Sequence, residues 1–552
     1  MKQLIYSLFL FGMASASAQQ TVGLIDYEFG NEDGYVLFSP MSSTETFLID
    51  KCGQKVNTWS SSDYRPALSA YLLEDGSLLR TGQFNNPDFD EGGSGGIIER
   101  FDWNGNLNWS YTLSDQSNCL HHDIHALPNG NIICIVWDSY TTAEGIANGM
   151  DPAYPNQQIW SEKIVELQPV GANDAIVVWE WKLWDHLVQE EDASKPNFGT
   201  VSEHPELVDL NYFLNPGNGP DWVHLNSIDY NPDLDQLLFS SHTFNEVWII
   251  DHSTSTAEAA THAGGNSGKG GDLLYRWGNP QTYQRGNPTT KKLYAQHHAT
   301  WIPNGYPNAG KILVFNNGLN RPGNFSSIDM IDPPIDGSNN YSITASEAFL
   351  PTELFWTYTA NPASDFYSSN ISGVYPLENG SFMITNGRAG TFFEIDSENQ
   401  TLWKYINPIT MSGAVAQGSV PTNNLVFRAN FYPSNYSGLS GQNLVPMGEI
   451  ELNPTIPSIC ELVQSSKSLE KSEIIVSAYP NPFAESTTIS YENREQKNAL
   501  LTICTLTGQQ VKSISNSTGK IYLNREDLPA GVYFYQLRTA DGHQASGKLV
   551  MQ

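Results

Sequence analysis

Histidine is the side chain best suited to acid–base and nucleophilic chemistry near neutral pH, and this sequence holds only 12 of them. Three stand eight residues ahead of a turn residue: His122 before Gly130, His224 before Pro232 and His297 before Gly305. Side chains alternate between the two faces of a strand, so equal offsets predict that these three imidazoles share one face. Asn226, two residues after His224, lies on the same face. A further segment places Ser372 at this offset, with Asn370 two residues before it.

Two kinds of chemistry fit three converging imidazoles. Neutral imidazoles can bind Zn²⁺ or Cu²⁺. Alternatively, one neutral imidazole attacks an electrophile, while the other imidazoles and an amide donate hydrogen bonds to the charged transition state. The spacing alone leaves both possibilities open.

The elements that must position these residues follow a repeat between residues 35 and 450. Six segments end in a predicted strand that carries tryptophan: 56–59, 107–111, 176–181, 273–277, 354–358 and 402–405. Several units begin with an Asn-Gly or Asp-Gly turn, which supplies the positive φ of a tight hairpin: 74–76, 128–130, 303–305 and 378–380. Four antiparallel strands in each of six units predict an all-β, six-bladed β-propeller. A pair of β-sandwiches is the alternative, which the long repeat disfavours.

A propeller must also close its ring. We expect the N-terminal strands 35–37 and 46–49 to pair with the C-terminal strand 425–431 in one shared blade, which removes exposed strand edges. The first strand of each blade lines the central channel. The three spaced histidines should therefore meet at one mouth of that channel.

Composition excludes several classes of partner. The 552 residues include 59 acidic and 28 basic side chains, a formal charge of −31. Such a surface repels phosphate backbones and anionic membranes, so we expect neither nucleic acid nor a membrane surface as a partner. Apolar residues make up 39% of the chain, enough for a substantial core.

The N-terminus predicts export. Residues 1–18 contain a lysine, an apolar stretch and an Ala-Ser-Ala cleavage site, the pattern of a secretory signal peptide. No later segment offers 18 consecutive apolar residues, so no transmembrane segment is expected. The five cysteines show no zinc-binding spacing. We expect one disulfide, between Cys52 and Cys460, that ties the two ends of the closing blade together.

The pattern changes near residue 453, which predicts a propeller over 19–453, a linker over 454–472 and a small β-sandwich domain over 473–552. The last segment contains SAYPNPF at 477–483, GVYFYQL at 531–537 and GKLVMQ at 547–552. It resembles the type A C-terminal sorting domain of the type IX secretion system. The resemblance implies that this machinery is a partner and that the protein is secreted or held at the cell surface.

Linked motifs of the first domain resemble the arylsulfotransferase family. They are CLHHDIHALPNG at 119–130, WDHLVQ at 184–189, DWVHLNSI at 221–228, GGDLLYRWG at 270–278, AQHHATWIPNG at 295–305, and ISG at 371–373 with ENG at 378–380. The resemblance implies a six-bladed propeller. It also implies transfer of a sulfuryl group from an aryl sulfate ester to a phenol through a sulfohistidine, without a nucleotide sulfate donor. No cofactor or metal is implied.

Site residues follow from the same resemblance. His297 matches the nucleophile, and His224 with Asn226 matches the pair that holds the sulfate oxygens. His122 matches the first-blade histidine of the family, with His121 as its alternative, and is placed to protonate the leaving phenolate and later deprotonate the acceptor phenol.

Three residues are expected to bind substrate: His242, His121 and Asn370. The family carries an arginine where this chain has His242, which donates hydrogen bonds but is a cation only below its pKa. The competing hypotheses are a non-catalytic surface propeller that binds glycans, sulfated ligands or proteins, and a metal-dependent propeller enzyme.

Overall fold

The computed structural model describes residues 20–455, except 29, 155–157, 213–218 and 344–346, together with residue 460 and residues 476–552, except 492–497, 506–509, 527 and 540–543. The chain forms two compact units, Met1–Pro454 and Thr455–Gln552. The expected signal peptide and most of the expected linker lie outside the described residues. Within the described part of the chain, no helix is both long and apolar enough to cross a membrane.

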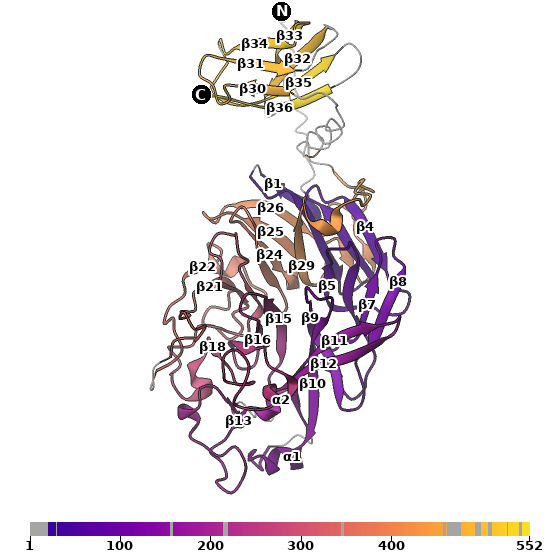
Figure 1. The fold of residues 1–552 in the computed structure, drawn as a ribbon. Coiled ribbons are helices and arrows are strands. Elements are labelled where there is room, and N and C mark those ends of the chain that lie inside the picture. Colours follow the sequence, from indigo (N-terminus) through magenta and orange to yellow (C-terminus); the bar gives the residue numbers. More distant parts are fainter. Residues whose placement is uncertain are drawn as a thin grey trace, which may run out of the picture. The chain divides into compact units, whose positions relative to one another are not determined.

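Six antiparallel sheets, five of four strands and one of five, form the blades of the first unit (Figure 1). Each contains four strands of the repeat. From the innermost strand outward they are β29, β2, β3 and β4 (Val426–Pro433, Gly34–Pro40, Glu45–Asp50, Lys55–Ser60); β5 to β8 (Pro66–Leu72, Leu78–Gln83, Gly96–Phe101, Leu107–Thr112); β9 to β12 (Asn118–Ala126, Ile132–Thr141, Gln158–Val170, Asp174–Lys182); β15 to β18 (Leu225–Asn231, Gln236–Ser241, Glu246–Asp251, Tyr275–Trp277); β19 to β22 (His297–Trp301, Ile312–Asn316, Ser327–Ile331, Trp356–Tyr358); and β23 to β26 (Gly373–Pro376, Phe382–Asn386, Thr391–Ile395, Thr401–Ile406). The innermost strands β29, β5, β9, β15, β19 and β23 contact one another in that order, and β23 contacts β29 again. This closed order confirms the predicted six-bladed propeller.

Several shorter elements lie outside the four-stranded repeat of the blades. Strand β1 (Gly23–Tyr27) pairs with the outer edge of β26. The long insertions carry α1 (Thr142–Ala147), α2 (Thr256–Ala259) and the two-residue strands β13 and β14 (Leu187–Val188, Val208–Asp209), and β27 and β28 (Ile409–Thr410, Gly413–Ala414) form a further short hairpin.

The repeated tryptophans of the outer strands join neighbouring blades. Their indole N–H groups donate at 2.7–3.0 Å to a backbone carbonyl of the next blade, in the pairs Trp59–Asp102, Trp109–Asp174, Trp181–Gly271, Trp277–Pro351 and Trp403–Lys51. The rings themselves are almost completely buried. Each tryptophan thus fills the space between two sheets and satisfies a carbonyl at the sheet edge, which explains its recurrence in the sequence.

The ring closes in the blade predicted to hold both chain ends. The C-terminal strand β29 pairs with β2, from Gly34 opposite Pro433 to Pro40 opposite Val426. Cys52 and Cys460 are each disulfide-bonded, as the expected bridge requires. The remaining cysteines, Cys119, Cys134 and Cys504, are free thiols.

The second unit is a small β domain of its own. A three-stranded sheet contains β30, β31 and β34 (Val476–Tyr479, Ser486–Tyr491, Lys520–Asn524), and a four-stranded sheet contains β32, β33, β35 and β36 (Ala499–Thr505, Gln510–Asn516, Gly531–Thr539, Gln544–Met551). Both sheets contribute to one apolar core, in which Ile489 and Leu523 from the first lie with Leu501 and Leu537 from the second.

Candidate active site

Five imidazoles form the histidine cluster: His121, His122, His224, His242 and His297. The ring of His122 lies 4.4 Å from that of His224, His224 lies 5.0 Å from His242, and His242 lies 5.5 Å from His297, measured between ring centroids. His121 adjoins His122 at 5.1 Å. The structure therefore brings together the three histidines at equal spacing and the two named beside them.

Unusual backbone geometry presents these side chains. His122 and His224 have φ of 52° and 54°, in the left-handed region that non-glycine residues rarely adopt. In β19 the left-handed residue is His298, with φ of 51°, one position after His297. The equal spacing in sequence thus does not correspond to equal backbone positions, because each inner strand carries its own β-bulge.

Asn317 determines which nitrogen of His297 carries the proton. The Asn317 side-chain amide donates to the carbonyls of Ser368 at 2.8 Å and Ile371 at 2.9 Å, which fixes its orientation. Its Oδ1 must then accept from Nδ1 of His297, 2.8 Å away. On the other side of the ring, Nε2 accepts the backbone N–H of Ile371 at 3.1 Å. Burial lowers the pKa of His297 to about 3, so the ring is neutral with its lone pair on Nε2.

His224 carries the opposite electrostatic character. Burial disfavours its charged form, but the carboxylate of Asp221, 2.5 Å from Nδ1, outweighs burial and raises the pKa of His224 above its ordinary value. Asp221 in turn accepts the indole N–H of Trp137 at 3.2 Å. The cluster thus holds a neutral imidazole at His297 and a partner that readily carries positive charge at His224.

His121 connects His122 to a buried carboxyl group. Its Nδ1 lies 2.8 Å from Nδ1 of His122, and its Nε2 lies 2.9 Å from Oε2 of Glu162. The ring of His121 stacks on Trp137, with 4.1 Å between centroids and 8° between planes. His121 and Glu162 are both completely buried.

The other predicted site residues are His242, Asn226 and Asn370, and their contacts could not be read from their positions in the sequence. Burial, with His224 nearby, holds the pKa of His242 well below its usual value, so His242 is neutral and does not supply the charge of an arginine. The amide of Asn226 donates to the backbone carbonyl of Gln296 at 2.8 Å, which supports the chain beside His297. Asn370 has an exposed side chain; its peptide bond to Ile371 is the part that reaches His297.

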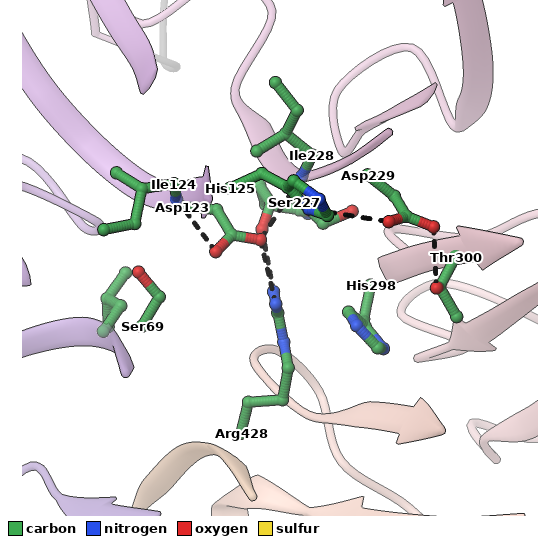
Figure 2. Close-up of polar contacts among 12 residues, drawn as sticks. Ser69, Asp123, Ile124, His125, Ser227, Ile228, Asp229, His298, Thr300 and Arg428 are labelled. Carbon is green, nitrogen blue, oxygen red and sulfur yellow. Dashed lines mark hydrogen bonds and ion pairs between the residues drawn. The ribbon is translucent and has the colours of Figure 1, made fainter. Parts of the chain in front are cut away.

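A second polar group, here called the belt, contains Asp123, Arg428, His298 and Tyr71 and links four inner strands (Figure 2). Arg428 donates to Asp123 at 2.8 Å and to the hydroxyl of Tyr71 at 3.1 Å. Figure 2 shows His298 beside this arginine, and Nδ1 of His298 accepts the backbone N–H of Val374 at 3.1 Å. Arg428 is thus committed to Asp123, and His298 belongs to the belt rather than to the histidine cluster.

One group outside the cluster has metal-ligand composition. His186 and His262 place Nδ1 at 2.8 Å and 2.7 Å from the same oxygen of Asp272. Nε2 of His186 also lies 2.8 Å from the carbonyl of Ala259. The hydrogen bonds of these groups already account for both nitrogens of His186, and His262 is largely exposed.

Two clefts, of about 530 Å³ against β18 and about 560 Å³ against β5, contain no member of the histidine cluster. The candidate site is therefore defined by its converging side chains and not by either cleft. Three of its polar partners were not found from the sequence: Asn317, Asp221 and Glu162. Asp221 lies in the same short motif as His224, which is the one available signal, whereas Asn317 and Glu162 stand in segments without a motif.

Two family models match the chain. The family model described as Arylsulfotransferase (ASST) matches residues 32–416. A Secretion system C-terminal sorting domain matches residues 477–552, so the protein is secreted to the cell surface or the extracellular space. No curated protein matches the sequence.

Solved structures resemble the chain only distantly. A Bacteroides caccae protein of unknown function is 12% identical over 72% of this chain and 98% of its own, with a TM-score of 0.40. Catalytically inactive virginiamycin B lyase from Staphylococcus aureus is 13% identical over 71% of this chain and 90% of its own, with a TM-score of 0.32. At these values neither bears on function. The family match spans most of the propeller, and the chain belongs to the arylsulfotransferase family.

Proposed function

We propose that the protein is an exported aryl-sulfate sulfotransferase. It moves a sulfuryl group from a phenolic sulfate ester to a phenolic acceptor through a sulfohistidine at His297, without a nucleotide donor. The observation that carries this proposal is the buried, neutral imidazole of His297, whose Nδ1–H is held by Asn317 and whose lone pair is on Nε2. That is the protonation state a nucleophilic imidazole requires.

The neighbouring groups fit the charges of the reaction. Sulfuryl transfer, like phosphoryl transfer, spreads negative charge over three oxygens while the attacking and leaving atoms stay in line. His224, charged through Asp221, stabilises those oxygens. The Ile371 N–H leaves Nε2 when sulfur arrives and becomes a further donor to the same oxygens. His122 exchanges a proton with the phenol oxygen.

The experiment compares two adjacent histidines. His297→Ala should abolish transfer from an aryl sulfate to a phenol. His298→Ala should retain the nucleophile and chiefly weaken packing, because His298 contacts the belt near Arg428 and Val374. Donor alone should add one sulfuryl mass to the peptide that holds His297, sought at alkaline pH because such adducts are acid-labile.

A covalent intermediate also predicts ping-pong kinetics. Full activity of His297→Ala, or an adduct on another residue, contradicts the proposal. Binding of aryl sulfates without any turnover would instead support the non-catalytic surface propeller, which the neutral His242 in place of an arginine favours.

A further inference from the structure

The histidine cluster contains a hydrogen-bonded chain that ends at a buried carboxyl group. It runs from His122 through His121 to Glu162, with 2.8 Å between the two Nδ1 atoms and 2.9 Å between Nε2 of His121 and Oε2 of Glu162. Among the described residues, none makes a hydrogen bond to Nε2 of His122, so the outer end of the chain is open toward the cluster. The inner end is a carboxyl group with no access to solvent.

We propose that Glu162, His121 and His122 form a proton relay in which Glu162 stores the proton that His122 delivers to the leaving phenolate. This inference rests on the proposed function. It identifies Glu162 as the residue that supplies a new proton to the general acid, His122. The sequence predicted one histidine acting alone, with His121 as its alternative. The geometry instead makes the two histidines consecutive members of one chain.

The hydrogen bonds allow two states that differ by one proton. Each short contact must contain a single hydrogen, because two lone pairs or two N–H groups cannot face each other at these distances. In the loaded state Glu162 is protonated and donates to His121 Nε2, His121 Nδ1–H donates to His122 Nδ1, and His122 carries a proton on Nε2. In the discharged state the carboxylate accepts from His121, and Nε2 of His122 bears the lone pair.

The transfer balances in both half-reactions. As the donor S–O bond breaks and the bond from His297 Nε2 to sulfur forms, the phenolate oxygen takes the Nε2 proton of His122. His122 takes the proton of His121 at Nδ1, His121 takes the proton of Glu162 at Nε2, and a carboxylate remains. The acceptor phenol later returns one proton along the same path as its oxygen attacks sulfur, which restores the loaded state.

The surroundings favour the loaded state at rest and fix the orientation of the side chains that form the relay. Burial raises the pKa of Glu162 well above its usual value and lowers the pKa of His121 to about 3, so the proton resides on the carboxyl group. Oε1 of Glu162 accepts the backbone N–H of Leu225 at 2.9 Å, which anchors the carboxyl group. Trp137 stacks on His121 and prevents its ring from turning out of the chain.

Glu162→Gln tests the relay with little change in shape. A glutamine amide can accept from Leu225 and donate to His121, but it cannot release a proton. Donors with poor leaving groups need general acid help, which contributes about 10²–10⁴-fold, whereas a nitrophenolate leaves with little assistance. We therefore expect kcat/KM for phenyl sulfate to fall by about 10²-fold or more, while nitrophenyl sulfate loses less than about 10-fold.

Glu166→Gln is the matched control. Glu166 lies on the same strand, β11, and also contacts a histidine, His252 at 3.1 Å, outside the histidine cluster. It should leave the ratio of the two donor rates unchanged. Equal losses on both donors in Glu162→Gln would assign Glu162 a purely structural role and overturn the relay.

A measurement on the unaltered protein covers the case in which Glu162→Gln fails to fold. In mixtures of H₂O and D₂O, the rate with phenyl sulfate should fall along a curve as the deuterium fraction rises, because several protons move in one step. A straight line indicates a single moving proton and overturns the relay. Wild-type protein that transfers from neither donor refutes the proposed function itself, and the relay with it.

Discussion

Replacing Asn317 with alanine tests the proposed role of His297 as the nucleophile and leaves His297 itself unchanged. The side chain makes three hydrogen bonds, to Ser368 and Ile371 as donor and from His297 as acceptor. Alanine removes the shorter of the two acceptors of the Nδ1 proton and leaves the carbonyl of Ala295, 3.2 Å away. The ring of His297 is then held less firmly in the orientation that presents the lone pair of Nε2.

The expected loss follows from how this hydrogen bond changes during the reaction. A neutral hydrogen bond contributes about 1 kcal/mol and one to a charged group about 1.5–3 kcal/mol. As Nε2 bonds to sulfur, positive charge develops on the imidazole, so the bond to Asn317 strengthens by about 1–2 kcal/mol in the transition state. That difference corresponds to about 5- to 30-fold in rate, and loss of the fixed orientation brings the total to about 10²-fold.

The assay follows the burst of nitrophenol released from nitrophenyl sulfate without acceptor, which reports formation of the sulfohistidine directly. Asn316→Ala is the matched control, because Asn316 is equally buried. It also makes three hydrogen bonds, with Tyr294, Lys292 and Asp329. Both variants should lose about 3 kcal/mol of unfolding free energy. Only Asn317→Ala should slow the burst. Equal burst rates per folded molecule would show that the hydrogen bond from His297 to Asn317 does not assist the attack.

Three further predictions concern charge in the cluster. If charged His224 stabilises the sulfuryl oxygens, kcat/KM should fall as pH rises through the raised pKa of His224. Asp221→Asn lowers this pKa and should move the fall to lower pH. An unchanged pH profile would contradict this role of His224. The same pair contributes stability that is present below the ordinary histidine pKa of 6.5 and lost as pH rises through the raised value, which thermal unfolding across that range measures. His242→Arg supplies the permanent charge that neutral His242 lacks and should raise kcat/KM for aryl sulfates about 10-fold, about 1.4 kcal/mol of transition-state stabilisation. A decrease would show that the site is built around a neutral ring at this position.

Features that depend on residues close together in the sequence could be predicted from the sequence alone. The Asn-Gly and Asp-Gly turns determine where hairpins form, and Gly76, Gly130, Gly305 and Gly380 all take the positive φ that such turns need. Tryptophan recurs in the outer strands and marks the blade period, since its ring fills the gap to the next sheet. The unpaired strands at the two ends of the repeat predicted the shared closing blade, because an open sheet edge is unfavourable.

The tertiary structure decided which atoms of the site are charged and where the protons lie. Asn317 reaches His297 from 20 residues away and Glu162 reaches His121 from 41 residues away, across strands whose register no local pattern specifies. The β-bulges of the inner strands decided that His297 joins the histidine cluster while His298 joins the belt. Burial made His297 and His242 neutral, whereas Asp221 kept His224 basic. A pKa depends on every charge and dipole around a buried group, so only the folded chain determines which histidine is neutral and which one carries charge.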